Sequence, residues 1–335
     1  NYMRVALDQC VVANRALVSK GKSLSPSSLA RLHAAIELMI DVVDGSHGRM
    51  PNHGANDGAL VHPITLGTHE DYRPSLTAAC HSFAHPLPAD IEYDRETLAW
   101  LGAATVERAD ARSDGVRRGA SGWVNARLGS LHLFMRAGRY TSRPSHIDPL
   151  HVDICVDGRP VVVDPGTFSY NAPGPWRHGF SSARVHNGPL VDGREPGIRG
   201  PRFLWLEWPA AEIGRAARVG GRVEIEARVP GSHSRRITLS GDVAVITDEV
   251  IATGEHEIRV LWLLHPDAGP ALLHCADGQR KQAVEDDPIG WYAPAYGRRV
   301  ASTYVEAVAR SEKARIVTFV GRGAPQTRNE TTTDR

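Results

Sequence analysis

Imidazole and carboxylate side chains crowd one segment in the middle of the chain. His146, Asp148 and His151 come shortly before an alternation of apolar residues, and Asp164 ends the apolar run that follows. Buried imidazoles and carboxylates are costly unless they are hydrogen-bonded, paired or bound to a metal. Nitrogen and oxygen ligands of these two types suit Zn²⁺. The segment is therefore a candidate metal or catalytic site, although hydrogen-bonded loop residues would give the same pattern.

A β-hairpin is predicted to position these side chains. Apolar residues alternate over 152–156, and Asp157-Gly158 is typical of a two-residue hairpin turn. Four cross-strand pairs follow from that turn: Val156 with Arg159, Ile154 with Val161, Val152 with Val163, and His151 with Asp164. One face is then expected to be core, and the other carries three polar residues: His151, Asp153 and Asp164.

The bulk composition narrows the class of protein. The 335 residues suffice for two domains with a sizeable core. The formal net charge of +1 gives no reason to expect nucleic acid or an acidic membrane surface as a partner. Four cysteines are widely spaced and form no C-x-x-C, so they are expected to be buried apolar residues rather than a disulfide or zinc-finger framework. No apolar stretch approaches the roughly 20 residues of a membrane span.

Helical periodicity dominates the first third of the chain. Apolar residues recur at helical spacing within 2–20, and Ser25-Pro26 is a typical start for a second helix that stops before Gly45. Two further helices are expected at about 70–84 and 94–108. The long loop at 46–69 is rich in Gly, Pro, His, Asn and Asp, and loops of this length are usually functional or disordered.

After Asp110 the pattern changes to period two. A polar linker at 115–122 precedes many short alternating segments, such as 131–135, 222–229 and 243–248. The chain is therefore predicted to be an α+β multidomain protein, with a helical domain over 1–112, an antiparallel β-sandwich over 120–322 and a polar, frayed tail over 323–335. On sequence alone the helices fit a simple bundle equally well.

Several short blocks, in a fixed order, resemble the heparinase II/III-like polysaccharide lyase superfamily. The β-domain signature lies at 144–148, 164–170, 185–187 and 191–193, and further blocks lie at 231–236, 254–257 and 264–266. The loop 50–58 resembles a loop in the helical domain of that group. The segment Asn1-Tyr2-Met-Arg resembles the one that carries its catalytic tyrosine.

The resemblance implies an incomplete (α/α) toroid that leads into a large antiparallel β-sandwich, with a cleft between them that binds an acidic polysaccharide or oligosaccharide. This chain would contain the later part of the toroid, so the N-terminal part of a longer protein would be missing. The resemblance also implies a structural metal, expected to be Zn²⁺, held by His146, Asp164 and His186. His151 then becomes a neighbour of the site.

The implied activity is β-elimination at a 4-linked uronic acid, in a periplasmic or secreted protein. Tyr2 would transfer the proton, and a positively charged or hydrogen-bonding group would stabilise the enolate-like transition state. His53 is a candidate for that group. Arg177 and Arg184 could pair with uronate carboxylates. The aromatic residues that could stack on sugar rings, unless they belong to the core, are Tyr170, Trp176 and Trp205.

Two departures from the family pattern keep other functions open. Active members often carry a histidine where this chain has Pro144, and the Asn-His pair of the toroid would lie upstream of Tyr2. The alternative is a non-catalytic carbohydrate-binding or polysaccharide-assembly protein that retains the lyase fold. A third possibility is a glycoside hydrolase that uses two carboxylates such as Asp57 and Glu70.

Overall fold

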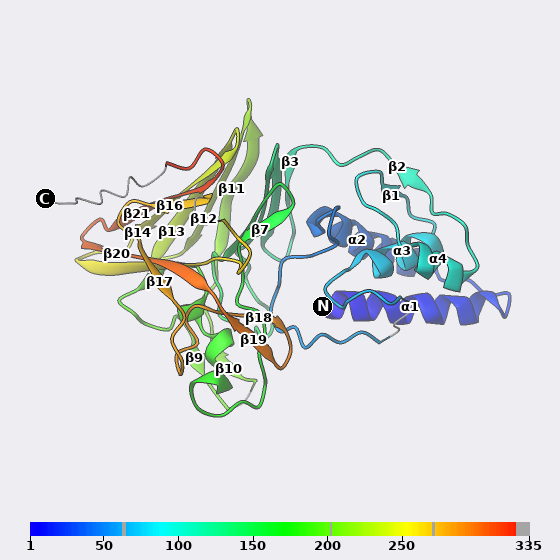
Figure 1. Cartoon of the computed structure of the whole chain (residues 1–335), viewed down its shortest axis with the longest axis horizontal. Coiled ribbons are helices and arrows are strands. Elements are labelled where there is room, and N and C mark those ends of the chain that lie inside the picture. Colours follow the sequence, from blue (N-terminus) through cyan, green and yellow to red (C-terminus); the bar gives the residue numbers. More distant parts are fainter. Residues whose placement is uncertain (62–64, 202, 270–271, 326–335) are drawn as a thin grey trace, which may run out of the picture. The chain divides into compact units, whose positions relative to one another are not determined.

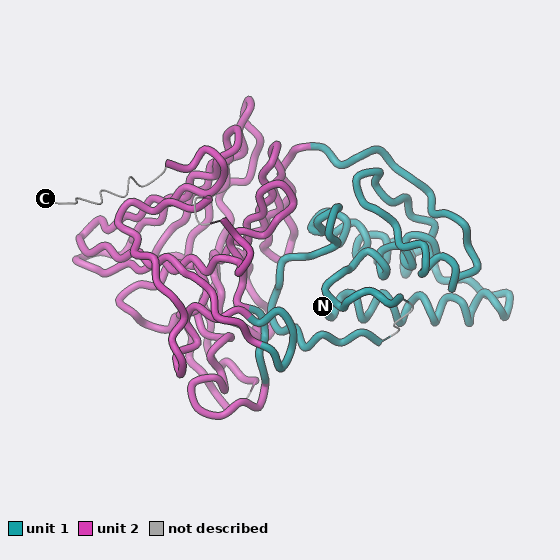
Figure 2. The backbone as a smooth tube through the Cα atoms, viewed as in Figure 1, with its two compact units in different colours: residues 1–113, 166–169, 293–298 teal, residues 114–165, 170–292, 299–335 magenta. Residues whose placement is uncertain are grey.

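The computed structural model describes residues 1–61, 65–201, 203–269 and 272–325. The described chain divides into two compact units (Figure 2). Unit 1 comprises Asn1–Ser113, Gly166–Ser169 and Ala293–Arg298, and unit 2 comprises the remainder. Most of the expected polar tail, 326–335, lies outside the described residues.

Unit 1 is built around four helices, which Figure 1 labels: α1 (Tyr2–Val18), α2 (Pro26–Val42), α3 (Arg73–Ser82) and α4 (Arg95–Leu101). Helix α2 begins where the sequence predicts, because the Ser25 hydroxyl accepts a hydrogen bond from the Ser28 N–H at 3.2 Å and Pro26 occupies the first turn. The core of the unit joins α1, α2 and α3 through fully buried side chains, including Leu7, Ile36 and Leu76.

Helix α4 is shorter than the sequence suggests. The predicted helix at 94–108 ends at Leu101, because Gly102 adopts a left-handed conformation with φ of 72° and its N–H bonds back to the last turn. The chain then extends, and β2 (Arg108–Ala109) pairs in parallel with β1 (Leu87–Pro88). The helix expected at 70–84 also begins later, at Arg73.

Unit 2 consists of antiparallel sheets (Figure 1). A five-stranded sheet has the order β3-β4-β5-β6-β7, with bounds Gly115–Arg118, Trp123–Leu128, Leu131–Arg136, Val152–Val156 and Arg159–Val162. A six-stranded sheet has the order β11-β12-β13-β14-β21-β16, with bounds Glu212–Val219, Arg222–Val229, His233–Ser240, Val243–Val250, Arg315–Gly321 and Leu273–Cys275. A four-stranded sheet has the order β17-β20-β15-β8, with bounds Gln279–Gln282, Thr303–Ser311, His256–Leu263 and Leu190–Val191.

Shorter elements accompany these sheets. Two hairpins pair β9 (Ile198–Arg199) with β10 (Trp205–Glu207), and β18 (Trp291–Ala295) with β19 (Arg298–Ala301); the second hairpin includes the Ala293–Arg298 segment of unit 1. Three 3-10 helices follow β7 along the described chain: η1 (Gly174–Arg177), η2 (Gly179–Ser181) and η3 (Ala183–Val185). The described part of 123–320 contains no α-helix.

One hydrophobic core joins the three larger sheets. Period-two alternation turns every second side chain inward, so that all three sheets contribute side chains that are completely buried, among them Val124, Leu133, Ile154, Ile225, Ile246, Val260 and Trp262. The sheets therefore pack face to face as a β-sandwich.

The predicted hairpin forms, but with a different register. Val156 lies opposite Arg159 as expected, whereas a register shift between Ile154 and Cys155 places Ile154 opposite Val162 instead of Val161. Cys155 faces Pro160 at this bulge. Proline has no N–H to donate to the ladder, so a regular two-residue alternation is interrupted there.

The second strand of the hairpin then changes partner. Val162 forms an isolated bridge with Leu264, and the Val163 N–H donates to the Leu263 carbonyl at 3.1 Å. The expected pairs of Val152 with Val163 and of His151 with Asp164 are therefore replaced, because the chain beyond Val162 turns toward β15. Val163 packs in a second small cluster with Leu263, rather than on the face formed by Ile154.

A buried arginine ties the six-stranded sheet to the segments around 150 and 187. Arg235 of β13 is fully buried, and its Nε and Nη2 donate to Asp248 at 2.7 and 2.9 Å. Its Nη1 donates to the Leu150 carbonyl at 2.7 Å and to Asn187 Oδ1 at 3.0 Å, and Nη2 also reaches the Asn187 carbonyl at 2.7 Å. All guanidinium N–H groups are thus used, and the group lies 4.9 Å from the Trp262 ring centre.

Replacing Asp248 by Asn should destabilise the protein strongly. The variant keeps the shape of the side chain but leaves the Arg235 charge buried without its counter-ion, so we expect the free energy of unfolding to fall by about 3–5 kcal/mol. Urea denaturation measures this change. Glu249→Gln on the same strand is the control, since Glu249 pairs with Arg236 at the surface and should matter by less than about 1 kcal/mol. Equal losses in the two variants would contradict this account.

Candidate functional site

Four buried side chains in unit 2 converge in a geometry that suits a metal ion. They are His146, Asp148, Asp164 and His186, and one ligand atom from each lies within 4.8 Å of all the others. Their exposed fractions are 4, 2, 1 and 2 %, respectively. The structure thus brings together the three predicted ligands and adds Asp148, which the sequence had placed only at the open end of the hairpin.

The local fold explains why distant segments meet here. The side chain of Asn187 makes two hydrogen bonds to the backbone at the start of β6. Its Oδ1 accepts from the Val152 N–H at 2.8 Å, and its Nδ2 donates to the Val152 carbonyl at 2.7 Å. At Gly188 a Cβ atom would lie 2.1 Å from the Pro149 carbonyl oxygen, so only glycine allows this close approach. The turn that carries His186 is therefore docked against the segment that follows His146.

Arg136 is the electrostatic centre of the cluster. It ends β5 and is 2 % exposed, and its Nη1 donates to Asp148 at 2.6 Å and to Asp164 at 2.8 Å. Its Nη2 donates to Asp153 at 2.8 Å. Burial favours the neutral guanidine, but the three carboxylates outweigh it and raise the pKa of Arg136 well above its ordinary value. We did not predict this residue, although an arginine that ends the apolar strand 131–135 was the available signal.

Among the described ion pairs, carboxylates outnumber the guanidinium at this cluster. Arg136 contacts three carboxylates, so with neutral imidazoles the cluster retains two negative charges. Buried charge of this size is costly unless a cation compensates it. A divalent metal held by the four converging side chains would supply that compensation.

Both ring nitrogens of His186 face oxygen atoms that only accept hydrogen bonds. Its Nδ1 lies 2.7 Å from the Ser182 carbonyl oxygen, which can only accept, so Nδ1 carries the proton. Nε2 lies 3.1 Å from Asp164 Oδ2, which also only accepts. Either a second proton or a metal must therefore occupy that position. Burial opposes protonation, but Asp164 outweighs it and raises the pKa of His186.

His146 presents a second buried nitrogen donor. Its Nδ1 has no hydrogen-bond partner within the described part of the chain, which is unusual for a buried polar atom. Burial lowers the pKa of His146 to about 4, against the opposing effect of Asp164. The ring is thus neutral near pH 7, the state in which imidazole binds metals. For Asp164, burial is outweighed by Arg136 and His186, which hold its pKa well below the ordinary value.

His151 lies beside the cluster without joining it. Its Nδ1 accepts from the Asn187 N–H at 3.2 Å, so its proton is on Nε2, which lies 3.6 Å from Asp153. The only lone pair of the neutral ring is therefore already used. The preference for His146 over His151 as a ligand agrees with this geometry.

The predicted catalytic residues lie in unit 1. Tyr2, at the start of α1, is 57 % exposed, and its hydroxyl donates to Asp57 Oδ2 at 2.7 Å. Asp57 belongs to the loop 51–58, and its Oδ1 accepts from the Ala59 N–H at 3.3 Å. The structure thus joins Tyr2 to that loop. His53 is exposed in the same loop.

The predicted substrate-binding residues differ in accessibility. Arg177 and Arg184 are exposed, and Tyr170 is half-buried with its ring edge-on to Phe203. Trp176 is only 8 % exposed, and the Arg299 guanidinium covers its ring at 3.8 Å. Trp205 is similarly buried, beneath Arg199. The tryptophans thus offer little free ring surface, and all these substrate roles stay predictions.

A family model matches the β-domain and the segment before it. Residues 111–331 match the family model described as heparinase II/III-like, C-terminal. The chain therefore belongs to the heparinase II/III-like family, and the resemblance seen in the sequence is confirmed. No curated protein sequence matches it.

Solved lyase structures share the fold. The heparan sulfate lyase HepC from Pedobacter heparinus superposes with a TM-score of 0.67 and 12 % identity, over 96 % of this chain and 51 % of that protein. A heparinase III superposes with a TM-score of 0.61 and 11 % identity, over 89 % of this chain and 49 % of that protein. The chain thus spans about half the length of these relatives. Among its described residues, no helix has the length and apolar character needed to cross a membrane.

Replacing Arg136 by Met should destabilise the zinc-free protein in a pH-dependent way. Arg136 depresses the pKa of Asp164 in the folded state, so its contribution is present above the unfolded carboxyl pKa and is lost as the pH falls below it. We therefore expect a loss of at least about 3 kcal/mol at pH 7 that shrinks below about pH 4.

Urea denaturation at several pH values checks this expectation. Arg139→Met is the control, because Arg139 is largely exposed and its nearest carboxylate, Glu212, lies 3.7 Å away at the surface. A loss in the Arg136 variant that stays constant with pH would contradict the proposed charge balance.

Proposed function

We propose that this chain is the C-terminal part of a polysaccharide lyase that cleaves a uronic-acid-containing polysaccharide by β-elimination. The observation that carries the proposal is the buried cluster of imidazoles and carboxylates, which occurs at the family's motif positions in a chain with the fold of a heparan sulfate lyase. A polymeric substrate favours action in the periplasm or outside the cell.

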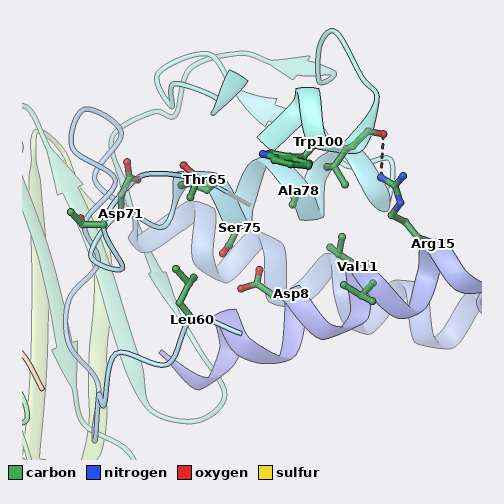
Figure 3. Close-up of a pocket in the computed structure, with 13 residues that line it drawn as sticks. Asp8, Val11, Arg15, Leu60, Thr65, Asp71, Ser75, Ala78 and Trp100 are labelled. Carbon is green, nitrogen blue, oxygen red and sulfur yellow. Dashed lines mark hydrogen bonds between the residues drawn. The ribbon is translucent and has the colours of Figure 1, made fainter. Parts of the chain in front are cut away.

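Unit 1 is, in this proposal, the later part of an (α/α) toroid. An open cavity of about 210 Å³ lies between α1, α3, α4 and loop residues that include Leu60 and Asp71 (Figure 3). Both apolar and polar side chains line it, with Asp8 and Asp71 among the polar ones, and two of the apolar ones are unusually exposed: Val12 at 46 % and Trp100 at 67 %. Exposed apolar side chains around a hollow suit a surface that further helices cover.

The cluster in unit 2 is proposed to hold a structural zinc ion. His146, Asp164 and His186 would be ligands, with Asp148 as the candidate for a fourth. Such a set of two nitrogens and two oxygens could close a tetrahedral site without an open position for substrate. The ion would neutralise the excess carboxylate charge beside Arg136 and hold three separate segments together.

Replacing Asp164 by Ala should remove both the metal and the stability that it provides. We expect about one zinc per wild-type chain, a strongly reduced content in the variant, and a lower melting temperature because the remaining imidazoles lose their shared partner. Metal analysis and thermal unfolding measure the two effects.

A variant of His151, which lies beside the cluster, is the control for the loss of a proposed zinc ligand. His151→Gln should keep its zinc, because His151 already uses its lone pair on Asn187. A wild-type protein without zinc after refolding in its presence, or unchanged zinc in Asp164→Ala, would refute the metal assignment.

Tyr2 is the proposed proton-transfer group. β-Elimination removes the C5 proton of the uronate and protonates the departing 4-oxygen. The Tyr2 hydroxyl donates a hydrogen bond to Asp57 at 2.7 Å, so its proton points toward that carboxylate and would have to turn away from it to reach a leaving group. To act first as the base, Tyr2 would have to break that hydrogen bond, since a phenolate has no proton to donate.

Two observations favour the non-catalytic alternative, a carbohydrate-binding or polysaccharide-assembly protein with the same fold. Pro144 stands where active members often carry a histidine, and proline cannot transfer a proton. The hydrogen bond from Tyr2 to Asp57 also stabilises the phenol rather than the base. The metal assignment is the same in both proposals.

Activity measurements on a longer protein decide between the two. We expect the 335-residue chain alone to have little or no activity, and a protein extended to the length of its relatives to release an unsaturated product that absorbs ultraviolet light. In that protein Tyr2→Phe should lower the turnover by at least ~100-fold and leave the fold intact, whereas Tyr93→Phe should have little effect. Full turnover in the Tyr2 variant would exclude Tyr2 as the acid/base. Inactivity on every uronate polymer would favour the non-catalytic protein.

A further inference from the structure

A carboxylate outside the metal cluster is hydrogen-bonded to the peptide group that contacts His186. Glu195 lies on the loop between β8 and β9, and its Oε1 accepts from the Ala183 N–H at 2.8 Å. Its Oε2 accepts from the Ser182 hydroxyl. Ser182 is also the residue whose carbonyl oxygen accepts from His186 Nδ1.

The Ala183 N–H and the Ser182 carbonyl belong to the same peptide group. A trans peptide is planar, so its N–H and C=O point in opposite directions. A carboxylate that fixes the N–H therefore also aims the carbonyl at His186. Its negative charge polarises the peptide and strengthens the carbonyl as an acceptor, as happens in chains of hydrogen bonds at low dielectric.

We propose that Glu195 is a positioning residue for the metal ligand, acting on His186 through the Ser182–Ala183 peptide. This inference rests on the zinc site proposed above. Metal-binding histidines commonly donate their second ring N–H to a carboxylate or to a carbonyl, which fixes the tautomer and raises the basicity of the ligating nitrogen. Here the Ser182 carbonyl accepts from the imidazole, and the Glu195 carboxylate accepts from the N–H of the same peptide group.

Further contacts fix the loop that carries Glu195 against the turn that carries His186. Arg199, on the far side of the same loop, donates from Nη1 to the Ser181 hydroxyl at 3.1 Å, and its guanidinium lies 4.0 Å from the Trp205 ring centre. The loop thus contacts two consecutive residues before the His186 turn, Ser181 through Arg199 and Ser182 through Glu195. If Glu195 served only to cap the 3-10 helix η3, its removal would leave the His186 imidazole unchanged.

Two measurements on the 335-residue chain test the proposal. Competition with a chelator gives the zinc affinity, and nitrogen-15 NMR of the zinc-free protein gives the Nδ1–H signal of His186, assigned by its absence in His186→Gln. Glu195→Ala should weaken zinc binding by about 10- to 100-fold and should shift the Nδ1–H signal, because its hydrogen bond to the Ser182 carbonyl is no longer held in place. Glu195→Gln keeps an acceptor for the Ala183 N–H without the charge, and should restore part of both properties.

The control is Glu207→Ala, an exposed carboxylate on β10, which should change neither measurement. Wild-type zinc affinity and wild-type His186 signals in Glu195→Ala would overturn the role of Glu195. If that variant does not fold, the same two results in Glu195→Gln would overturn it. If the wild type binds no zinc but the His186 signals still depend on Glu195, the metal assignment fails and the coupling of Glu195 to His186 stands.

Discussion

The requirement that buried charge be compensated shapes the centre of the β-domain. Arg136 meets three carboxylates at the end of β5, and a single guanidinium cannot neutralise them. In the low dielectric of the interior, the excess charge would favour either protonation of the imidazoles or the capture of a cation. The two buried nitrogens of His146 and His186 offer lone pairs to such a cation, so one constraint accounts for both the ligand types and their arrangement.

The rest of the sandwich keeps these groups in register. Arg235 of the six-stranded sheet donates hydrogen bonds to the backbone carbonyls of Leu150 and Asn187. The Asn187 side chain in turn accepts from the Val152 N–H at the start of β6. The site therefore depends on the sheet packing as much as on its own ligands. A metal at this position would join a framework that hydrogen bonds have already organised, which suits a structural rather than a catalytic ion.

Much of this arrangement was predictable from sequence, and the failures have physical causes. Period-two and helical patterns identified the strands and helices, and the short motif blocks identified the family. The predicted hairpin register was wrong because a bulge forms opposite Pro160, and the predicted α4 was too long because the helix ends at Gly102. Arg136 was missed because a lone arginine after an apolar strand has no spacing that distinguishes it, and Glu195 because its effect passes through a backbone peptide.

The central claim is that a zinc ion sits among His146, Asp148, Asp164 and His186. The most direct test is an anomalous difference map, recorded at the zinc absorption edge from crystals grown with zinc. The account predicts one strong peak at about 2.0–2.2 Å from a ring nitrogen of His146, a ring nitrogen of His186 and a carboxylate oxygen of Asp164. An ordered, well-resolved cluster with no peak at that position, or with the peak at other residues, would contradict it.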